Sequence, residues 1–270
     1  MRSRRSVAEL VRRGEEALDK ENLSEAEALA RRALMLSPES PVAKRLLATV
    51  LLELGRFEEA VESFEEVLEA EPEDVEALAD LGICLYEICE FQESESVLAR
   101  ALELAPDHPK ACYWMGLCVE RRDDYRGADE YLVRAHEIDP EAFPAPTRLT
   151  SEEFDQAVSE AIEELPSAIH NQLDNLTITV ADLPREDDLV GYDPPLPPWC
   201  YGLYVGVPLP ERTTGDLPKL PDEIHIYKRN LERICGDHEH LIEEIRITVL
   251  HEVGHYLGFD EEELEERGLA

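Results

Sequence analysis

Residues 251–261 read His251-Glu252-Val253-Gly254-His255-Tyr256-Leu257-Gly258-Phe259-Asp260-Glu261, and the first five form the pattern H-E-x-x-H. Residues four apart share one face of an α-helix, so His251 and His255 can bind one Zn²⁺ through their imidazole nitrogens. Glu252 lies about 100° further round the helix, beside such a metal. A carboxylate there can accept a proton from a metal-bound water and pass it to a leaving amine.

The residues around the motif predict a buried helix from 241 to 257. Apolar side chains lie on nearly every side of it: Ile242, Ile245, Ile247, Val249, Leu250, Val253 and Leu257. A helix that is apolar all round is usually buried, and buried polar groups are costly without partners. A metal ion would supply partners for the two histidines. The alternative is a chance match between ordinary helix residues and the motif.

A third ligand is expected shortly after the second histidine. Gly258 can end the helix in a left-handed turn and bring an acid back to the metal. Glu261 occupies the position at which the pattern H-E-x-x-H-x-x-G-x-x-H has its third ligand, and a carboxylate oxygen there suits zinc. Asp260 is the competitor; its other role would be to cap a last short helix, with Glu263 closing a capping box. Residues 260–263 could also be only a solvated acidic face.

A 34-residue repeat occupies residues 7–142. Four sets of positions keep this step: Pro38, Pro72, Pro106 and Pro140; Ala26, Ala60, Ser94 and Ala128; Gly14, Ala48, Gly82 and Gly116; and Ala33, Val67, Ala101 and Ala135. Small residues let two helices approach closely, and each proline ends the second helix of a pair. The pattern predicts four helix pairs stacked into a solenoid with a concave face.

This repeat resembles the tetratricopeptide repeat, although it lacks the bulky early aromatic residue of that family. The resemblance implies that the repeats bind a protein or peptide partner. The alternative is a structural spacer or a dimerisation surface. Tyr86, Tyr113 and Trp114 lie on first helices. They are candidates to line the groove, or else members of the core.

A linker is expected at residues 143–149, because Phe143-Pro144-Ala145-Pro146 interrupts the period. Thr150 then offers a helix N-cap with Glu153 closing a capping box, for a helix to about Glu164. Strands are expected at 176–180, 201–207 and 223–228, and a short helix at 230–235. Residues 182–198, rich in acids and prolines, are expected to form a loop.

The C-terminal half resembles a family of small bacterial zincin-like metallopeptidases. The resemblance is carried in order by residues 154–166, 175–180, 202–209, 220–227 and 251–261. It implies that residues 150–270 form a small α+β zincin-like domain, with a small sheet packed on the motif helix. It also implies zinc at His251, His255 and Glu261, with Glu252 as the base. The fold class expected for the whole chain is therefore an α-helical tetratricopeptide repeat solenoid followed by this domain.

One departure from the metzincin pattern concerns the floor of the site. No methionine follows the motif, since the methionines are Met1, Met35 and Met115. Without a Met-turn, the floor is expected to come from the helix after Thr150 and from Thr248.

Composition limits the partners and the setting. The net charge of −36 argues against nucleic acid and anionic membranes as partners. The chain contains no run of about 18 apolar residues, so no membrane span is expected. No apolar stretch follows Arg2, Arg4 and Arg5, so no signal peptide is expected either. Six cysteines without a C-x-x-C pair indicate a reducing, cytoplasmic setting.

These observations favour a zinc metallopeptidase whose repeats recruit a partner or substrate. Strand 201–207 could pair with an extended substrate, and Tyr204, Tyr227 and Tyr256 are candidate second donors to the oxyanion. The alternative is a non-catalytic interaction scaffold with a structural or vestigial zinc site.

Overall fold

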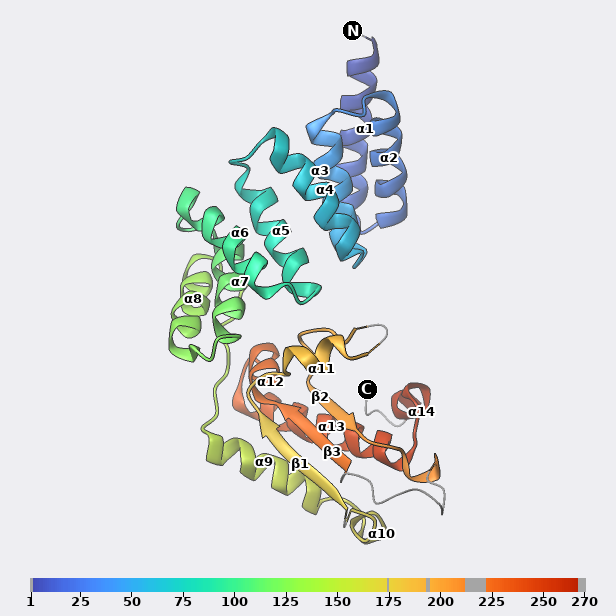
Figure 1. Cartoon of the computed structure of the whole chain (residues 1–270), viewed down its shortest axis with the longest axis vertical. Helices are drawn as coiled ribbons and strands as arrows, with labels where there is room; N and C mark the ends of the chain where they lie inside the picture. The colour runs from blue at the N-terminus through green and yellow to red at the C-terminus, as the bar shows by residue number, and fades with distance from the viewer. Residues whose placement is uncertain (1, 174, 193–194, 212–221, 267–270) are drawn as a thin grey trace. The chain divides into compact units, whose positions relative to one another are not determined.

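The chain folds as two compact units, Met1–Phe143 and Pro144–Ala270, called here the repeat unit and the C-terminal unit (Figure 1). The computed structural model describes residues 2–173, 175–192, 195–211 and 222–266. The boundary between the units falls within the segment 143–149 that the sequence predicts to be a linker.

The repeat unit consists of helix pairs joined by short turns (Figure 1). The helices are α1 (Arg2–Leu18), α2 (Leu23–Leu36), α3 (Pro41–Glu53), α4 (Phe57–Ala70), α5 (Val75–Glu87), α6 (Phe91–Leu104), α7 (Pro109–Glu120) and α8 (Tyr125–Ile138). Each helix packs on the next in sequence, and first helices also contact the first helices of neighbouring repeats. The predicted helical repeat array is confirmed.

Small residues at the repeated positions explain the close packing within each pair. Ala26, Ala60 and Ala128 are fully buried. A Cβ atom added at Gly82 of α5 would lie 2.5 Å from Cγ of Leu98 on α6, so a larger residue there would have to displace Leu98. The small residues that recur every 34 positions therefore lie where two helix backbones approach each other.

The aromatic residues on the first helices divide between core and surface. Tyr86 is buried and packs edge-on against Phe91 and Trp114, at centroid distances of 5.0 and 5.3 Å. It belongs to the core, so the alternative that Tyr86 lines a groove is wrong. Tyr113 and Trp114 are half-buried.

Ion pairs connect successive repeats. Lys110 Nζ lies 2.7 Å from Asp80 Oδ1, and Arg134 Nη2 lies 2.7 Å from Asp107 Oδ1. Arg45 approaches Asp74 at 3.3 Å in the same way. In a strongly acidic chain, these cations offset the repulsion between acidic residues of neighbouring repeats.

The cysteines of the repeat unit are small buried residues. Cys84, Cys89, Cys112 and Cys118 are buried and form no disulfide bond. Cys89 lies in the turn after α5 with φ of 65°.

The C-terminal unit is built on a three-stranded sheet in the order β1-β3-β2. Strand β3 (Asp222–Tyr227) is central; β1 (Leu176–Ala181) pairs with it in parallel and β2 (Gly202–Val205) antiparallel. All three lie within or beside the predicted strand segments. Because β2 is at the edge of the sheet, one side of its backbone faces away from β3.

Two helices form one core with this sheet. Helix α9 (Ser151–Glu163) begins at the predicted capping box, in which Glu153 N donates to Thr150 Oγ1 at 3.2 Å and Thr150 N donates to Glu153 Oε2 at 2.9 Å. Helix α13 (His238–Leu257) carries the motif. The shared core includes Phe154, Val158, Ile224, Ile226, Ile245 and Val249. Ile242 is 47% exposed, so α13 is buried on most sides but not all.

The remaining elements are short. They are α10 (Ser167–His170), α11 (Glu186–Val190), the 3₁₀ helix η1 (Leu209–Glu211), α12 (Lys228–Ile234) and α14 (Glu261–Glu266). Helix α11 lies in the segment 182–198 that was predicted to be a loop, and that prediction is wrong there because the fully buried Leu189 anchors a helical turn. Residues 193–194 of that segment, and 220–221 of the resemblance, lie outside the described residues.

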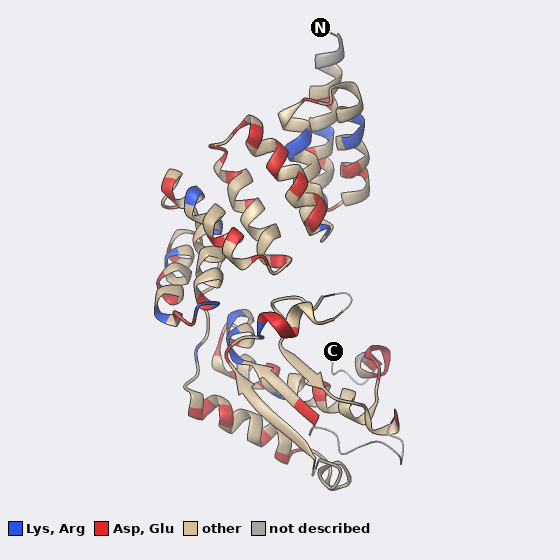
Figure 2. Cartoon of the chain, in the orientation of Figure 1, with Lys and Arg blue, Asp and Glu red and all other residues tan. Residues whose placement is uncertain are grey.

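The segment before α9 is fastened to α12 through a buried carboxylate. Glu232 is fully buried, and its two oxygens lie 2.9 Å from Arg148 Nη1 and 3.0 Å from Leu149 N. Thr147 N donates to the Glu232 carbonyl at 3.0 Å. Figure 2 shows that basic residues of this unit gather at α12. The C-terminal part of the predicted linker is therefore an integral part of the C-terminal unit.

We predict that Glu232→Ala destabilises the C-terminal unit by about 3–5 kcal/mol, because it leaves Arg148 and the Leu149 N–H without their buried acceptor. The chain has two tryptophans, and Trp114→Phe leaves Trp199 as a fluorescent reporter in the C-terminal unit. Urea unfolding of the full chain in this background measures the loss. Glu163→Ala, an exposed position, is the control and should change the free energy of unfolding by less than about 0.5 kcal/mol. Equal effects of the two variants would contradict the role given to Glu232.

Candidate active site

Helix α13 brings the two motif histidines to one face. Their Nε2 atoms are 2.9 Å apart, and the side chains of His251 and His255 are 21% and 26% exposed. The helix begins at Asp237, whose side chain accepts from His240 N at 2.9 Å. Because the apolar sides of the helix pack in the core, both imidazoles are held at the protein surface and are partly exposed to solvent.

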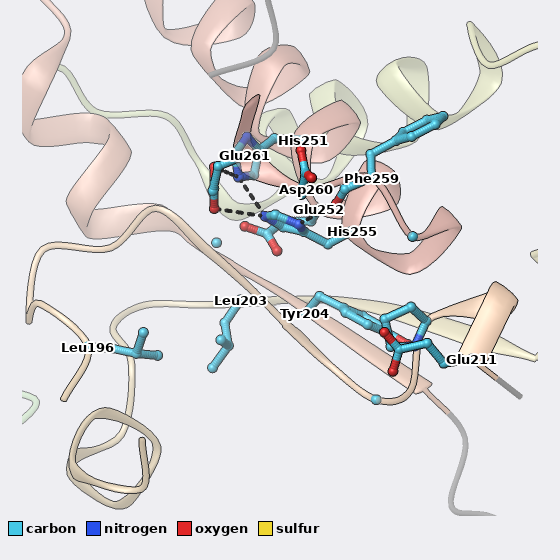
Figure 3. Close-up of a pocket in the computed structure, with 14 residues that line it drawn as sticks. Leu196, Leu203, Tyr204, Glu211, His251, Glu252, His255, Phe259, Asp260 and Glu261 are labelled. Atoms are coloured by element: carbon cyan, nitrogen blue, oxygen red, sulfur yellow. Dashed lines mark hydrogen bonds and ion pairs between the residues drawn. The ribbon is translucent and has the colours of Figure 1, made fainter. Parts of the chain in front are cut away.

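The chain turns back after α13 and brings Glu261 to this pair. Gly258 ends the helix with φ of 93°, and Phe259 N donates to Gly254 O at 3.0 Å. Glu261 Oε1 then lies 3.3 Å from His255 Nε2, and Glu261 Oε2 lies 3.7 Å from His251 Nε2. Figure 3 shows the three side chains pointing toward one another. Among the described residues, they are the group of three with metal-ligand spacing.

Asp260 has a different task in this geometry. Its Oδ1 accepts from Glu263 N at 2.9 Å, and its own N–H donates to Glu263 Oε2 at 3.2 Å. This is the capping box that the sequence offered as the alternative role of Asp260. Of the two candidate third ligands, Glu261 faces the histidines while Asp260 starts α14.

Helix α14 is docked on α13 by one apolar contact. Leu264 is fully buried, and a Cβ atom at Gly254 would overlap its side chain. The glycine inside the motif therefore leaves space for Leu264. That contact fixes the position of α14, and with it Glu261.

The donor set suits a zinc ion. Two imidazole nitrogens and one carboxylate oxygen are usual ligands of catalytic zinc, and donors about 2.0–2.1 Å from a tetrahedral ion are roughly 3.3 Å apart. The three donor separations of 2.9, 3.3 and 3.7 Å bracket that value. His255 Nδ1 lies 3.2 Å from the Phe259 carbonyl, and donation to that oxygen would leave Nε2 unprotonated and able to bind a metal.

Glu252 is buried between α13 and β2. Its residue is 6% exposed, and the Tyr204 backbone N–H donates to its carboxyl group. A Cβ atom at Gly202 would lie 2.6 Å from Glu252 Oε1 and 2.7 Å from its Cγ, so strand and side chain fit together only with glycine there. Burial raises the pKa of Glu252 to about 8, while the Tyr204 N–H lowers it and Glu261 raises it. A bound cation would lower this pKa again.

A cleft of about 510 Å³ opens beside these side chains. Besides the motif residues, it is lined by Leu196, by Gly202, Leu203 and Tyr204 of β2, by Gly206, Pro208 and Glu211, and by Gly258, Phe259 and Asp260. The prediction that Thr248 and the helix after Thr150 build the floor is wrong, since neither lines the cleft among the described residues. Thr248 Oγ1 instead donates to Glu244 O of its own helix at 2.8 Å.

The three tyrosines proposed as oxyanion donors have other partners or positions. Tyr204 lines the cleft, but its hydroxyl donates to Asp222 Oδ1 at 2.9 Å. The Tyr256 hydroxyl donates to the Gln172 carbonyl. Tyr227 is 2% exposed and does not line the cleft. The Tyr204 and Tyr256 hydroxyls are therefore bonded elsewhere, and Tyr227 is buried outside the lining of the cleft.

Sequence reasoning missed several residues that shape the site. Asp222 accepts hydrogen bonds from the Tyr204 hydroxyl and from Val207 N, which fixes the chain after β2. Leu264 and Glu211 carried no motif. Gly202 carried no motif either, although the Glu252 side chain packs directly against it.

Comparisons with known families agree with both halves of this description. Residues 173–269 match the family of zincin-like metallopeptidases, and residues 17–63 and 51–113 match the tetratricopeptide repeat. A search of curated proteins found no match. The chain therefore joins a tetratricopeptide repeat region to a zincin-like metallopeptidase domain, as the sequence resemblances predicted. The zincin-like metallopeptidase family in general implies a bound zinc ion.

Solved structures resemble the chain over about half its length. Residues 41 to the end of MamA from Desulfovibrio magneticus RS-1 give a TM-score of 0.46 at 22% identity, covering 50% of this chain and 76% of that one. YrrB, described as a TPR protein with an unusual peptide-binding site, gives 0.43 at 28% identity, covering 47% and 66%. The K341M mutant of the Thermobaculum terrenum O-GlcNAc transferase gives 0.48 at 20% identity, covering 51% and 27%.

We predict that Gly202→Ala destabilises the metal-free protein by about 1–3 kcal/mol, because the new methyl group overlaps the Glu252 side chain. In a Glu252→Ala background the overlapping atoms are gone, and the same substitution should cost less than about 0.5 kcal/mol. Urea unfolding of the four proteins of this cycle measures the coupling. An equal cost in both backgrounds would mean that the methyl group strains β2 and not Glu252.

We predict that Leu264→Ala weakens zinc binding about 10–100-fold although it removes no ligand, because α14 no longer holds Glu261 beside the histidines. Leu264→Met, which keeps an apolar side chain of similar volume, should retain most of the affinity. Competition with a chelating dye measures both dissociation constants. Unchanged affinity in Leu264→Ala would disprove the link between α14 docking and the third ligand.

Proposed function

We propose that this protein is a zinc-dependent metallopeptidase, with His251, His255 and Glu261 as zinc ligands and Glu252 as the general base. The proposal rests on one observation: two features lie together in one open cleft. A His-His-Glu donor set with zinc spacing lies beside a buried carboxyl group, and both face an edge strand. A purely structural site has no need of such a base.

Zinc in a site with three protein ligands supplies a Lewis acid and lowers the pKa of water toward about 7. Glu252 takes the proton of the attacking water and delivers it to the leaving amine. Its burial is compatible with this role, since burial raises the pKa of the carboxyl group and a bound cation would lower it again, toward the range in which the group can both accept and return a proton. The Tyr204 N–H and Gly202 keep it in place against β2.

The edge of β2 is the proposed binding surface for the substrate backbone. Tyr227 N donates to Tyr201 O, so in this antiparallel pairing Leu203 and Val205 direct their peptide groups at β3. Gly202 and Tyr204 direct theirs outward along the cleft, where the Tyr204 N–H donates to Glu252. An extended peptide added there would lie beside Glu252 and the metal ligands.

The repeat unit is proposed to recruit a protein partner or the substrate itself. Tetratricopeptide repeats generally mediate protein or peptide interactions, and tethering raises the local concentration of a substrate at the peptidase domain. Among the described residues, no helix is long and apolar enough to cross a membrane.

The test is a digest of a peptide library by wild-type protein, with and without chelator, beside Glu252→Gln. We predict that the wild type cleaves peptides only with zinc, and that Glu252→Gln keeps about one zinc per chain, measured by mass spectrometry, while its turnover falls at least about 100-fold. Glu262→Gln, an exposed carboxylate of α14, should retain turnover. Unchanged turnover in Glu252→Gln would remove it as the base.

The alternative is an interaction scaffold in which zinc is structural. It would be favoured if the purified protein holds zinc, loses stability with chelator and cleaves no peptide of the library.

A further inference from the structure

The cleft contains a carboxylate that the proposed chemistry does not use. Four acidic side chains line it: Glu211, Glu252, Asp260 and Glu261. Glu252 is the proposed base, Glu261 the proposed ligand, and Asp260 caps α14. Glu211 has none of these roles, and within the described part of the chain it forms no hydrogen bond or ion pair with another side chain.

Glu211 is set in the wall of the cleft by its neighbours. It ends η1, where Glu211 N donates to Pro208 O at 3.0 Å. Pro210 packs directly on Gly258, since a Cβ atom at Gly258 would lie 2.6 Å from Pro210 Cγ. The start of the same segment is held by the bond of 3.1 Å from Val207 N to Asp222. The backbone that carries Glu211 is thus attached to the end of the motif helix.

The charge of the cleft is one-sided. No lysine or arginine lines it among the described residues. A bound zinc ion adds two positive charges, which leaves a net charge of about −2 when the four carboxylates are ionised. Acidic residues are common in this chain, so the number of them alone decides nothing. The relevant observation is that one carboxylate beyond the proposed chemistry lies on the proposed path of the substrate.

The two ends of the cleft differ in chemistry. Along its strand side, Leu196 and Leu203 lie on one side of Tyr204, and Glu211 lies on the other (Figure 3). A peptide along β2 would place its side chains toward both ends, with the metal ligands opposite the middle. One end offers apolar contacts, and the other offers a carboxylate.

We propose that this site selects peptides with a cationic side chain, lysine or arginine, on the side of the scissile bond nearer Glu211, and that Glu211 is the residue that recognises it. The proposal rests on the proposed peptidase function and names its substrate class. A lysine or arginine reaching Glu211 would form a charge-assisted hydrogen bond, whereas an acidic side chain would meet a like charge.

The test measures binding apart from turnover. The protein is the zinc-loaded full chain carrying Glu252→Gln, and the probes are three sets of fluorescent octapeptides. The sets are identical except that lysine, methionine or glutamate is scanned through the central positions. Anisotropy titrations at low and high salt give the dissociation constants. We predict that the best lysine peptide binds about tenfold tighter than its methionine counterpart, which is about 1.4 kcal/mol, and that high salt reduces the difference.

Adding Glu211→Gln should remove most of the preference for lysine, and adding Glu211→Lys should transfer it to the glutamate peptides. Glu262→Gln is the matched control, because it removes one nearby charge outside the lining of the cleft. A lysine preference that is absent, or equal in Glu211→Gln and Glu262→Gln, overturns the inference.

Digestion of the same peptides by the wild type separates this result from the proposed function. If the wild type cleaves them without dependence on Glu211, the peptidase stands and the inference fails. If binding depends on Glu211 but nothing is cleaved, the cationic site stands and the proposed catalysis fails.

Discussion

Helix α13 is buried on most sides in the core of the C-terminal unit and still presents polar side chains to the cleft. Its apolar residues pack against α9 and the inner face of the sheet. The two histidines stand at the border of the cleft, but Glu252 is almost fully buried. A carboxyl group in that position requires a hydrogen bond and a shaped space, and β2 supplies both through the Tyr204 N–H and the missing side chain of Gly202. The site therefore depends on how closely β2 approaches the motif helix.

The small size of the domain has consequences for how Glu261, the proposed third ligand, is held. A metzincin has a methionine turn below its metal, and this chain has no methionine after Met115. Here α14, six residues long, is held on α13 by Leu264 in the space left by Gly254. The capping box of Asp260 and Glu263 orients the start of that helix, and Glu261 follows from it. Contacts within this short stretch of chain therefore set the position of Glu261 without a methionine turn.

Charged residues are arranged differently in the two units. In the repeat unit, several cations bridge successive repeats, as Lys110 does with Asp80. In the C-terminal unit, cations gather at α12, where Arg148 neutralises the buried Glu232. Apart from the two histidines, the charged side chains in the described lining of the cleft are acidic. The described lining of the cleft is therefore negative, which connects the overall acidity of the chain to the substrate class proposed for it.

Sequence by itself determined the features that arise from local or periodic interactions. The step of 34 residues predicted the helix pairs, because small residues must recur wherever two helices touch. The capping boxes at Thr150 and Asp260, the end of α13 at Gly258 and the pairing of His251 with His255 follow from contacts within one or two turns. Tertiary structure alone decided the rest. It gave the Tyr204 hydroxyl to Asp222, and it built the wall of the cleft from β2 and η1 and not from Thr248. Each of these outcomes depends on which surfaces pack together across long stretches of chain, and no spacing within a single segment encodes that.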